Sequence, residues 1–185
     1  MEALEQLKEH CRSCERCGLC RTRHNMVFGV GNPNADLMLV GEGPGEQEDL
    51  QALPFVGPAG KLLDEMLSII DVSRKTNCYI ANIVKCRPPG NRDPIEEEQD
   101  ACFPFLQQQI AFVKPKVIVC LGRIAARRLI SPDYRITREH GQWISRDGVW
   151  YTAIYHPSAL LRDLSKRPET FDDLLSIREK LRELL

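Results

Sequence analysis

The chain has 185 residues, of which 43% are hydrophobic and 28% are charged, a composition typical of a single globular domain spanning 1–185. The formal net charge of -1 gives no global argument for nucleic-acid binding, so any such surface must come from local basic clusters. No apolar run is long enough to cross a membrane, and the acidic N-terminus carries no signal-peptide pattern, so we expect a cytoplasmic protein.

The first part of the chain alternates helical and strand patterns. Residues 1–10 carry leucines at helical spacing and predict a short amphipathic helix. Residues 11–24 form a cysteine-rich segment, and residues 28–34 read as a loop rich in glycine, asparagine and proline. Residues 37–40 are a continuous apolar run ended by glycine, which predicts a strand buried on both faces. A helix then opens at Pro58, with apolar residues at helical spacing.

The middle of the chain repeats this alternation. Residues 78–84 predict a second strand, followed by an irregular loop at 85–92 that proline and glycine shape. A helix with an acidic first turn is expected over 94–112. Residues 116–121 predict a third strand, and Gly122 leads into a helix rich in arginine.

The last part completes the pattern. Residues 131–150 look irregular or hairpin-like, and residues 149–155 predict a fourth strand. A short helix follows His156-Pro157-Ser158, and an amphipathic helix runs from Pro168. Strands that alternate with helices favour a parallel sheet between helical layers.

A glycine-rich turn follows the first buried strand, with the sequence Gly41-Glu42-Gly43-Pro44-Gly45 and further carboxylates after it. Open α/β sheets bind ligands at the carboxyl ends of their strands, so this turn is a candidate site. It matches neither a phosphate-binding Walker loop nor a dinucleotide fingerprint. A tight strand-to-helix connection with solvated acids is the alternative interpretation.

Eight cysteines are many for a chain in a reducing compartment, and they favour metal or redox chemistry over disulfides. Four of them repeat every three residues, at positions 11, 14, 17 and 20, a spacing that approaches but does not match the ferredoxin run. Thiolates suit zinc as well as an iron–sulfur cluster, so both stay open. Cys78 and Cys120 lie within strand patterns and are expected to be buried hydrophobic residues.

Several motifs stand in order along the chain: the turn Gly41–Gly45 with Glu48-Asp49, then Pro54-Phe55-Val56-Gly57, then the run from Asn82 to Pro89, then His156-Pro157-Ser158. This set resembles the family 4 uracil-DNA glycosylases, the iron–sulfur branch of their superfamily. The resemblance covers about residues 14–162. It implies a three-layer α/β/α fold with a central four-stranded parallel sheet. It also implies a [4Fe–4S] cluster.

The same resemblance implies an activity: hydrolysis of the N-glycosidic bond of deoxyuridine in DNA, which releases uracil and leaves an abasic site. Its implied cluster ligands are Cys14, Cys17, Cys86 and Cys102. The implied catalytic residues are His156, Glu42 and Glu48, and the implied uracil-binding residues are Gly41, Gly43, Phe55 and Asn82. The implied DNA contacts are Arg87, Ser158, Leu160 as a wedge, and Arg162, with Arg21, Arg23, Lys85 and Arg92 as further basic residues near the site.

The chemistry suits these residue types. His156 can donate to the departing uracil as negative charge develops, and a carboxylate can stabilise the cationic sugar and orient water. Phe55 can stack on the flipped base, and Asn82 can bind its edge. The only lysine in the matched motifs is Lys85, in the cysteine-bearing loop, so we expect a monofunctional enzyme without a Schiff-base step.

Some positions depart from the family pattern. Ala52-Leu53 stands where the family has Gly-Arg, and His140-Gly141 where it has Arg-Gly. A covalently binding branch carries a Lys-Arg-Arg-Ile-His insert that this chain lacks, which favours turnover. We expect a monomer that acts on uracil-containing DNA, single- or double-stranded, without a membrane partner. The alternatives are an iron–sulfur redox or electron-transfer protein, and a non-catalytic nucleic-acid-binding module with a structural metal.

Overall fold

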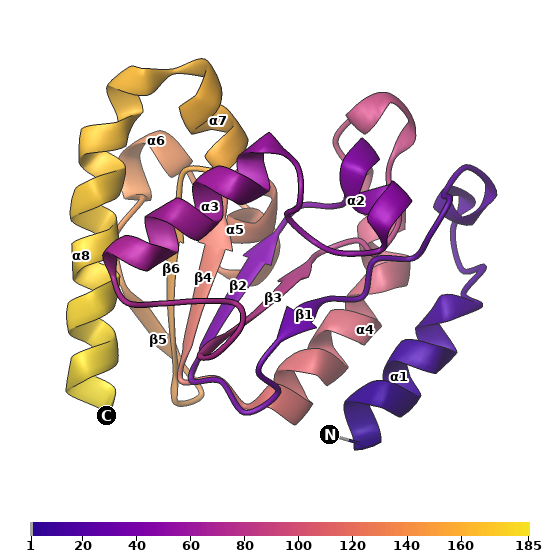
Figure 1. Cartoon of the computed structure of the whole chain (residues 1–185), viewed down its shortest axis with the longest axis horizontal. Helices are drawn as coiled ribbons and strands as arrows, with labels where there is room; N and C mark the ends of the chain where they lie inside the picture. The colour runs from indigo at the N-terminus through magenta and orange to yellow at the C-terminus, as the bar shows by residue number, and fades with distance from the viewer. Residues whose placement is uncertain (1) are drawn as a thin grey trace.

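The structure of the chain, a computed structural model, describes residues 2–185 and is built around one sheet (Figure 1). Its strands are β1 (Val30–Gly31), β2 (Leu37–Gly41), β3 (Cys78–Asn82), β4 (Val117–Leu121), β5 (Ile144–Arg146) and β6 (Val149–Ile154). They lie in the order β1-β3-β2-β4-β6-β5. Strands β3, β2, β4 and β6 pair in parallel, and β1 and β5 pair antiparallel at the two edges.

Helices cover both faces of this sheet. They are α1 (Glu2–Arg12), α2 (Glu46–Gln51), α3 (Pro58–Ile69), α4 (Glu96–Val113), α5 (Arg123–Leu129), α6 (Ile136–Glu139), α7 (Pro157–Arg162) and α8 (Arg167–Leu184). Three short 3-10 helices, η1 (Gly18–Arg21), η2 (Pro89–Asn91) and η3 (Leu164–Lys166), lie in the connections. Helices α1, α4 and α5 lie on one face, and α3, α7 and α8 lie on the other.

The core follows the alternation of side chains along the buried strands. In β2, Met38 and Val40 pack in the cluster under α1, α4 and α5, whereas Leu37 and Leu39 pack in the cluster under α3 and α8. A strand with helices on both faces needs apolar residues on both faces, which explains the continuous apolar run. The predicted three-layer α/β/α fold with four parallel strands is confirmed, and two short antiparallel strands extend it.

The two edge strands are where the structure adds to the sequence pattern. Residues 28–34 were expected to be a loop, yet Val30–Gly31 pairs with β3. A Cβ atom on Gly31 would lie 2.2 Å from the Cys78 carbonyl oxygen, so this glycine permits the close approach of an edge strand. Strand β5 forms a hairpin with β6, as the hairpin-like pattern of 131–150 predicted.

The parallel strands end together at one edge of the sheet. There the Ile83 N–H donates to the Gly41 carbonyl at 2.9 Å, and the Gly122 N–H donates to the Ile154 carbonyl at 2.9 Å. The glycine turn, the cysteine-bearing loop and His156 therefore meet at this edge, as the fold class predicts for a ligand site. Among residues 2–185, no helix is long and apolar enough to cross a bilayer.

Candidate active site and cysteine cavity

A cavity of about 590 Å³ opens at the carboxyl edge of the sheet. Its lining comes from the turn after β2, the loop after β3, the start of α5 and the segment after β6. Its volume is within the range of small-molecule sites. The predicted residues Glu42, Gly43, Phe55, Asn82 and His156 all line it.

Gly41 lets two other predicted residues converge. A Cβ atom on Gly41 would lie 2.5 Å from Asn82 Oδ1 and 2.6 Å from Phe55 Cζ, so a larger residue would separate these side chains. Phe55 is itself held by Arg74, whose Nη2 donates to the Phe55 carbonyl at 2.7 Å. Gly43 also has no room for a side chain, because its Cβ would lie 2.7 Å from Val84 Cγ2.

Asn82 presents a free acceptor to the cavity. It is the last residue of β3 and is 2% exposed. Its Oδ1 atom is buried and has no hydrogen-bond partner within the part of the chain that the structure describes. A buried acceptor without a partner costs free energy, so its place in this cavity favours a ligand that brings an N–H donor.

His156 is held in one tautomer. The Ser158 N–H donates to His156 Nδ1 at 3.0 Å, and Ser158 Oγ lies 2.7 Å from the same nitrogen. Nδ1 is thus an acceptor, which places the ring proton on Nε2. Burial, followed by the charge of Arg162, lowers the pKa of His156 to about 4. Near neutral pH the residue is therefore an uncharged N–H donor, with its ring centroid 5.6 Å from that of Phe55.

The two predicted carboxylates have different surroundings. Burial, and then the nearby Asp93 carboxyl, raises the pKa of Glu42 to about 7, while Arg123 lowers it. Glu48 Oε1 accepts a hydrogen bond from the Gly57 N–H at 3.4 Å, so this side chain joins α2 to the start of α3. The local sequence does not distinguish Asp93 from a solvated acid, since its contact with Glu42 forms only between two distant loops.

Four of the residues predicted to contact DNA lie in the lining of the cavity or in the loop beside it. Arg162 is exposed and lines the cavity, and Arg92 lines it too. Arg87 Nε donates to Asn91 Oδ1 at 2.7 Å, in the loop beside the cavity. Ser158 lines the cavity as well, but its hydroxyl is already engaged with His156.

The prediction that Leu160 is a wedge does not fit the structure. This side chain is 1% exposed and packs in the core cluster with α3 and α8, because it lies on the inner face of α7. The exposed apolar residues of this region are Leu161 at 43% and Leu164 at 63%. A wedge from this segment would have to come from one of these two.

The predicted DNA contact by Lys85 is also wrong, and Arg23 has partners within the protein. Lys85 is 1% exposed, and its Nζ donates to the Asn82 carbonyl at 2.9 Å and to Gln109 Oε1 at 2.5 Å. Burial lowers the pKa of Lys85 to about 8, and neighbouring cysteines oppose this effect. The guanidinium of Arg23 is directed at the cysteine segment instead, through bonds to the Cys14 carbonyl and to Cys86 Sγ.

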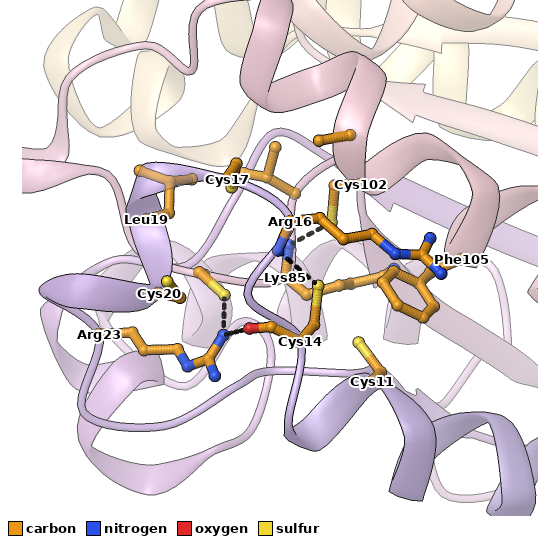
Figure 2. Close-up of a pocket in the computed structure, with 13 residues that line it drawn as sticks. Cys11, Cys14, Arg16, Cys17, Leu19, Cys20, Arg23, Lys85, Cys102 and Phe105 are labelled. Atoms are coloured by element: carbon orange, nitrogen blue, oxygen red, sulfur yellow. Dashed lines mark hydrogen bonds between the residues drawn. The ribbon is translucent and has the colours of Figure 1, made fainter.

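Six of the eight cysteines line a second cavity, which lies between the N-terminal segment and the loop after β3 (Figure 2). They are Cys11, Cys14, Cys17, Cys20, Cys86 and Cys102. Cys78 and Cys120 are instead fully buried in β3 and β4, as predicted. The fold thus brings the N-terminal cysteines to the two cysteines that are distant in sequence.

N–H groups donate to the sulfurs of three of the four implied ligands: Arg16 N to Cys14 Sγ at 3.5 Å, Arg23 Nη1 to Cys86 Sγ at 3.2 Å, and Lys85 N to Cys102 Sγ at 3.3 Å. Burial raises the pKa of the fourth, Cys17, and the Leu19 backbone N–H opposes this effect. Such donors stabilise the thiolate form that binds a metal centre. Across residues 2–185, no N–H group donates to the sulfur of Cys11 or Cys20.

The spread of these sulfurs bears on the kind of centre. Among the described residues, no three His, Cys, Asp or Glu side chains converge closely enough to hold a single metal ion. Structural zinc needs four ligands at about 2.3 Å from one point when they are thiolates. A four-iron cluster takes one thiolate on each iron, so its ligands stand further apart. The cysteines around this cavity are donors of the kind that an iron–sulfur cluster binds, and zinc accepts thiolates as well.

Comparisons with known proteins agree with this geometry. The family model described as the uracil DNA glycosylase superfamily matches residues 28–182. The chain is 44% identical to the type-4 uracil-DNA glycosylase of Archaeoglobus fulgidus, across 97% of this chain and 94% of that protein. It is 42% identical to the type-4 enzyme of Sulfurisphaera tokodaii, across 97% and 85%. Against the Thermotoga maritima type-4 enzyme it is 44% identical, across 89% and 86%.

Proposed function

The chain belongs to the uracil-DNA glycosylase superfamily, and within it to the type-4 uracil-DNA glycosylases, and from this membership we infer that it excises uracil from DNA. It is a hydrolase of N-glycosyl bonds that serves base excision repair, releasing uracil and leaving an abasic site. The observation that supports this best is the unpartnered Asn82 Oδ1 in a cavity shared with Phe55 and a neutral His156.

Base recognition follows from the two residues that Gly41 lets converge. The target base must leave the duplex stack to reach this cavity. Phe55 then stacks on the flipped base, which gives contact area without sequence information. Asn82 Oδ1 accepts from the N3–H of uracil, and the amide nitrogen donates to O4. Cytosine has an acceptor at N3 and a donor at N4, so a fixed amide in this orientation refuses it.

Bond cleavage follows from the charge that develops on each side of the glycosidic bond. Uracil leaves as an anion, and the Nε2–H of His156 donates to its O2 together with backbone N–H groups of the glycine turn. The sugar becomes cationic, and the Glu42 carboxylate stabilises it and orients the attacking water. Glu48 supports the turn through the Gly57 N–H.

The cysteine cavity is the proposed site of a [4Fe–4S] cluster, with Cys14, Cys17, Cys86 and Cys102 as its ligands. When bound, the cluster supplies thiolate–iron bonds that tie the N-terminal segment to the loop after β3. Hydrolysis moves no electrons between substrate and protein, so this role is structural. Lys85 lines the cysteine cavity, and its buried amine is bonded to the Asn82 carbonyl and to Gln109, which supports a monofunctional enzyme without a Schiff-base intermediate.

The substrate is DNA, and we propose that Arg87 and Arg162 contact its phosphates beside the cavity. Ser158 has its clearest role in holding His156, and we propose a phosphate contact only for its hydroxyl, as the competing role of this side chain. We further propose that the enzyme is a cytoplasmic monomer and that residues 1–185 form one functional domain.

The test of this function is release of uracil from a synthetic oligonucleotide that contains one deoxyuridine. The abasic product breaks on alkaline treatment, and a matched oligonucleotide with thymidine at the same position is the control. We expect cleavage of the uracil strand only. Iron-loaded protein without any uracil release would favour the alternative of an electron-transfer protein.

A further inference from the structure

Asp93 and Glu42 are neighbouring carboxyl groups in the lining of the active-site cavity. Glu42 lies in the turn after β2, and Asp93 lies between η2 and α4, yet both line the cavity. The Asp93 carboxyl lies close enough to Glu42 to raise its pKa both by its charge and by hydrogen bonding. Two carboxyl groups can form such a bond only when they share one proton.

The ion pair between Arg123 and Asp93 determines which of the two carboxyl groups holds the shared proton. The Nη2 atom of Arg123 and Asp93 Oδ2 form this pair at 2.5 Å, and Arg123 is the first residue of α5. The side chain of Asp93 is 51% exposed, whereas Glu42 is the more deeply buried of the two carboxylates. An exposed carboxylate bound to a cation stays ionised, so the shared proton resides on Glu42.

We propose that Asp93 and Arg123 are positioning residues that control the protonation of Glu42, and with it the pH range in which the carboxylate can act on water and the cationic sugar. This inference rests on the proposed hydrolysis of deoxyuridine. Asp93 does not touch the substrate in this scheme. It acts through Glu42.

The other charged groups that face this part of the cavity come from four further segments. They are Glu46 and Glu48 of α2, Arg92 of the loop after β3, His156 with Arg162, and Lys166. Glu48 is bonded to the Gly57 N–H, and both Nη atoms of Arg92 are bonded to Glu98. The direct partners of Glu42 are therefore the two members of the ion pair, which affect its pKa in opposite directions.

Burial and Asp93 raise the pKa of Glu42 to about 7, so the carboxylate form prevails only above this value and excision should rise with pH through it. Removing the anion with Asp93→Asn lowers the pKa of Glu42 and moves this rise to lower pH. Arg123 lowers the pKa of Glu42, so removing the cation with Arg123→Gln raises that pKa and moves the rise to higher pH.

The experiment is single-turnover excision from a deoxyuridine oligonucleotide, at subsaturating DNA, between pH 5 and 9. Each substitution should move the midpoint by about one pH unit, at the lower end of what a close charge produces. The matched control is Asp36→Asn. Asp36 pairs with Lys116 at 3.2 Å and precedes β2 at the strand end opposite Glu42, so its removal should leave the profile unchanged.

A carboxyl-carbon NMR titration of Glu42 in the DNA-free protein, assigned with Glu42→Gln, measures the same midpoints without turnover. Opposite shifts in the two folded variants support the proposal. Unshifted midpoints, or shifts in the same direction, overturn it. Wild-type protein that releases no uracil at any pH would instead overturn the proposed function, while the NMR titration would still decide the role of Asp93.

Discussion

At the residue scale, His156 depends on Ser158 for its tautomer. Both the N–H and the hydroxyl of Ser158 contact Nδ1, so the ring proton is kept on Nε2, which is the atom free to face the cavity. With its pKa lowered to about 4, His156 stays neutral near neutral pH. The titration of His156 therefore contributes no change in the excision rate near pH 6.5, where an ordinary histidine titrates.

Replacing His156 with alanine removes one donor to the developing uracil anion. We expect His156→Ala to slow single-turnover excision by about 10²–10³-fold, with little change in DNA affinity. Ser158→Ala should slow it by up to about tenfold, the scale of one hydrogen bond. A Ser158→Ala variant that lost DNA affinity but kept the excision rate would show that its hydroxyl serves a phosphate and not His156.

At the element scale, helix α2 joins the glycine turn to the cysteine segment. Asp49 of α2 is 1% exposed, and its carboxylate accepts from the backbone N–H groups of His24 at 2.9 Å and Asn25 at 3.1 Å. Asn25 Nδ2 donates in return to the Asp49 carbonyl at 2.8 Å. Arg23, which precedes His24 in the chain, donates to Cys86 Sγ. The two cavities are therefore connected through α2.

Removal of this carboxylate should loosen that connection. Asp49→Ala leaves two backbone N–H groups without their charged acceptor, and we expect a loss of about 2–3 kcal/mol in the free energy of unfolding, with a smaller loss for Asp49→Asn. Denaturant unfolding of the iron-loaded protein measures it. Glu46→Ala, an exposed site on the same helix, is the control. Equal midpoints for wild type and Asp49→Ala would mean that α2 is held by other contacts.

At the scale of the whole molecule, the loop after β3 serves both cavities. Asn82 ends the strand in the active site, Lys85 donates from its side chain to the Asn82 carbonyl and from its backbone to Cys102 Sγ, and Cys86 follows at once. A cluster bound at the cysteines would thus fix the strand end that presents Asn82. Such a cluster would have a structural role in a hydrolytic enzyme.

Cysteine substitutions test the ligand set. Purified protein should be brown and contain iron, and alanine at any of Cys14, Cys17, Cys86 or Cys102 should abolish the visible absorbance. Cys78→Ala and Cys120→Ala should keep it, since these thiols lie in the strands of the core. Cys11→Ala and Cys20→Ala should keep it too. A cluster that survives Cys102→Ala but not Cys20→Ala contradicts the assignment.

Local patterns were enough to predict the four parallel strands, because each is a continuous apolar run bounded by turn residues. They were not enough for β1, whose Gly31 reads as a loop residue until the backbone of β3 lies against it. The same limit applies at the site. The partnership of Asp93 with Glu42, the burial of Leu160 and the burial of Lys85 depend on contacts between distant segments, which no local pattern contains.

Excision of uracil recognised by Asn82 is tested most directly by single-turnover cleavage of matched uracil and cytosine oligonucleotides with wild type and Asn82→Asp. The aspartate loses the donor to O4 and sets a charge beside that acceptor, so its penalty exceeds the roughly 1–3 kcal/mol of a lost buried hydrogen bond. We predict that wild type releases uracil and no cytosine, and that Asn82→Asp loses most uracil release while fold and iron content stay intact. Full uracil release by a folded Asn82→Asp variant would contradict this recognition.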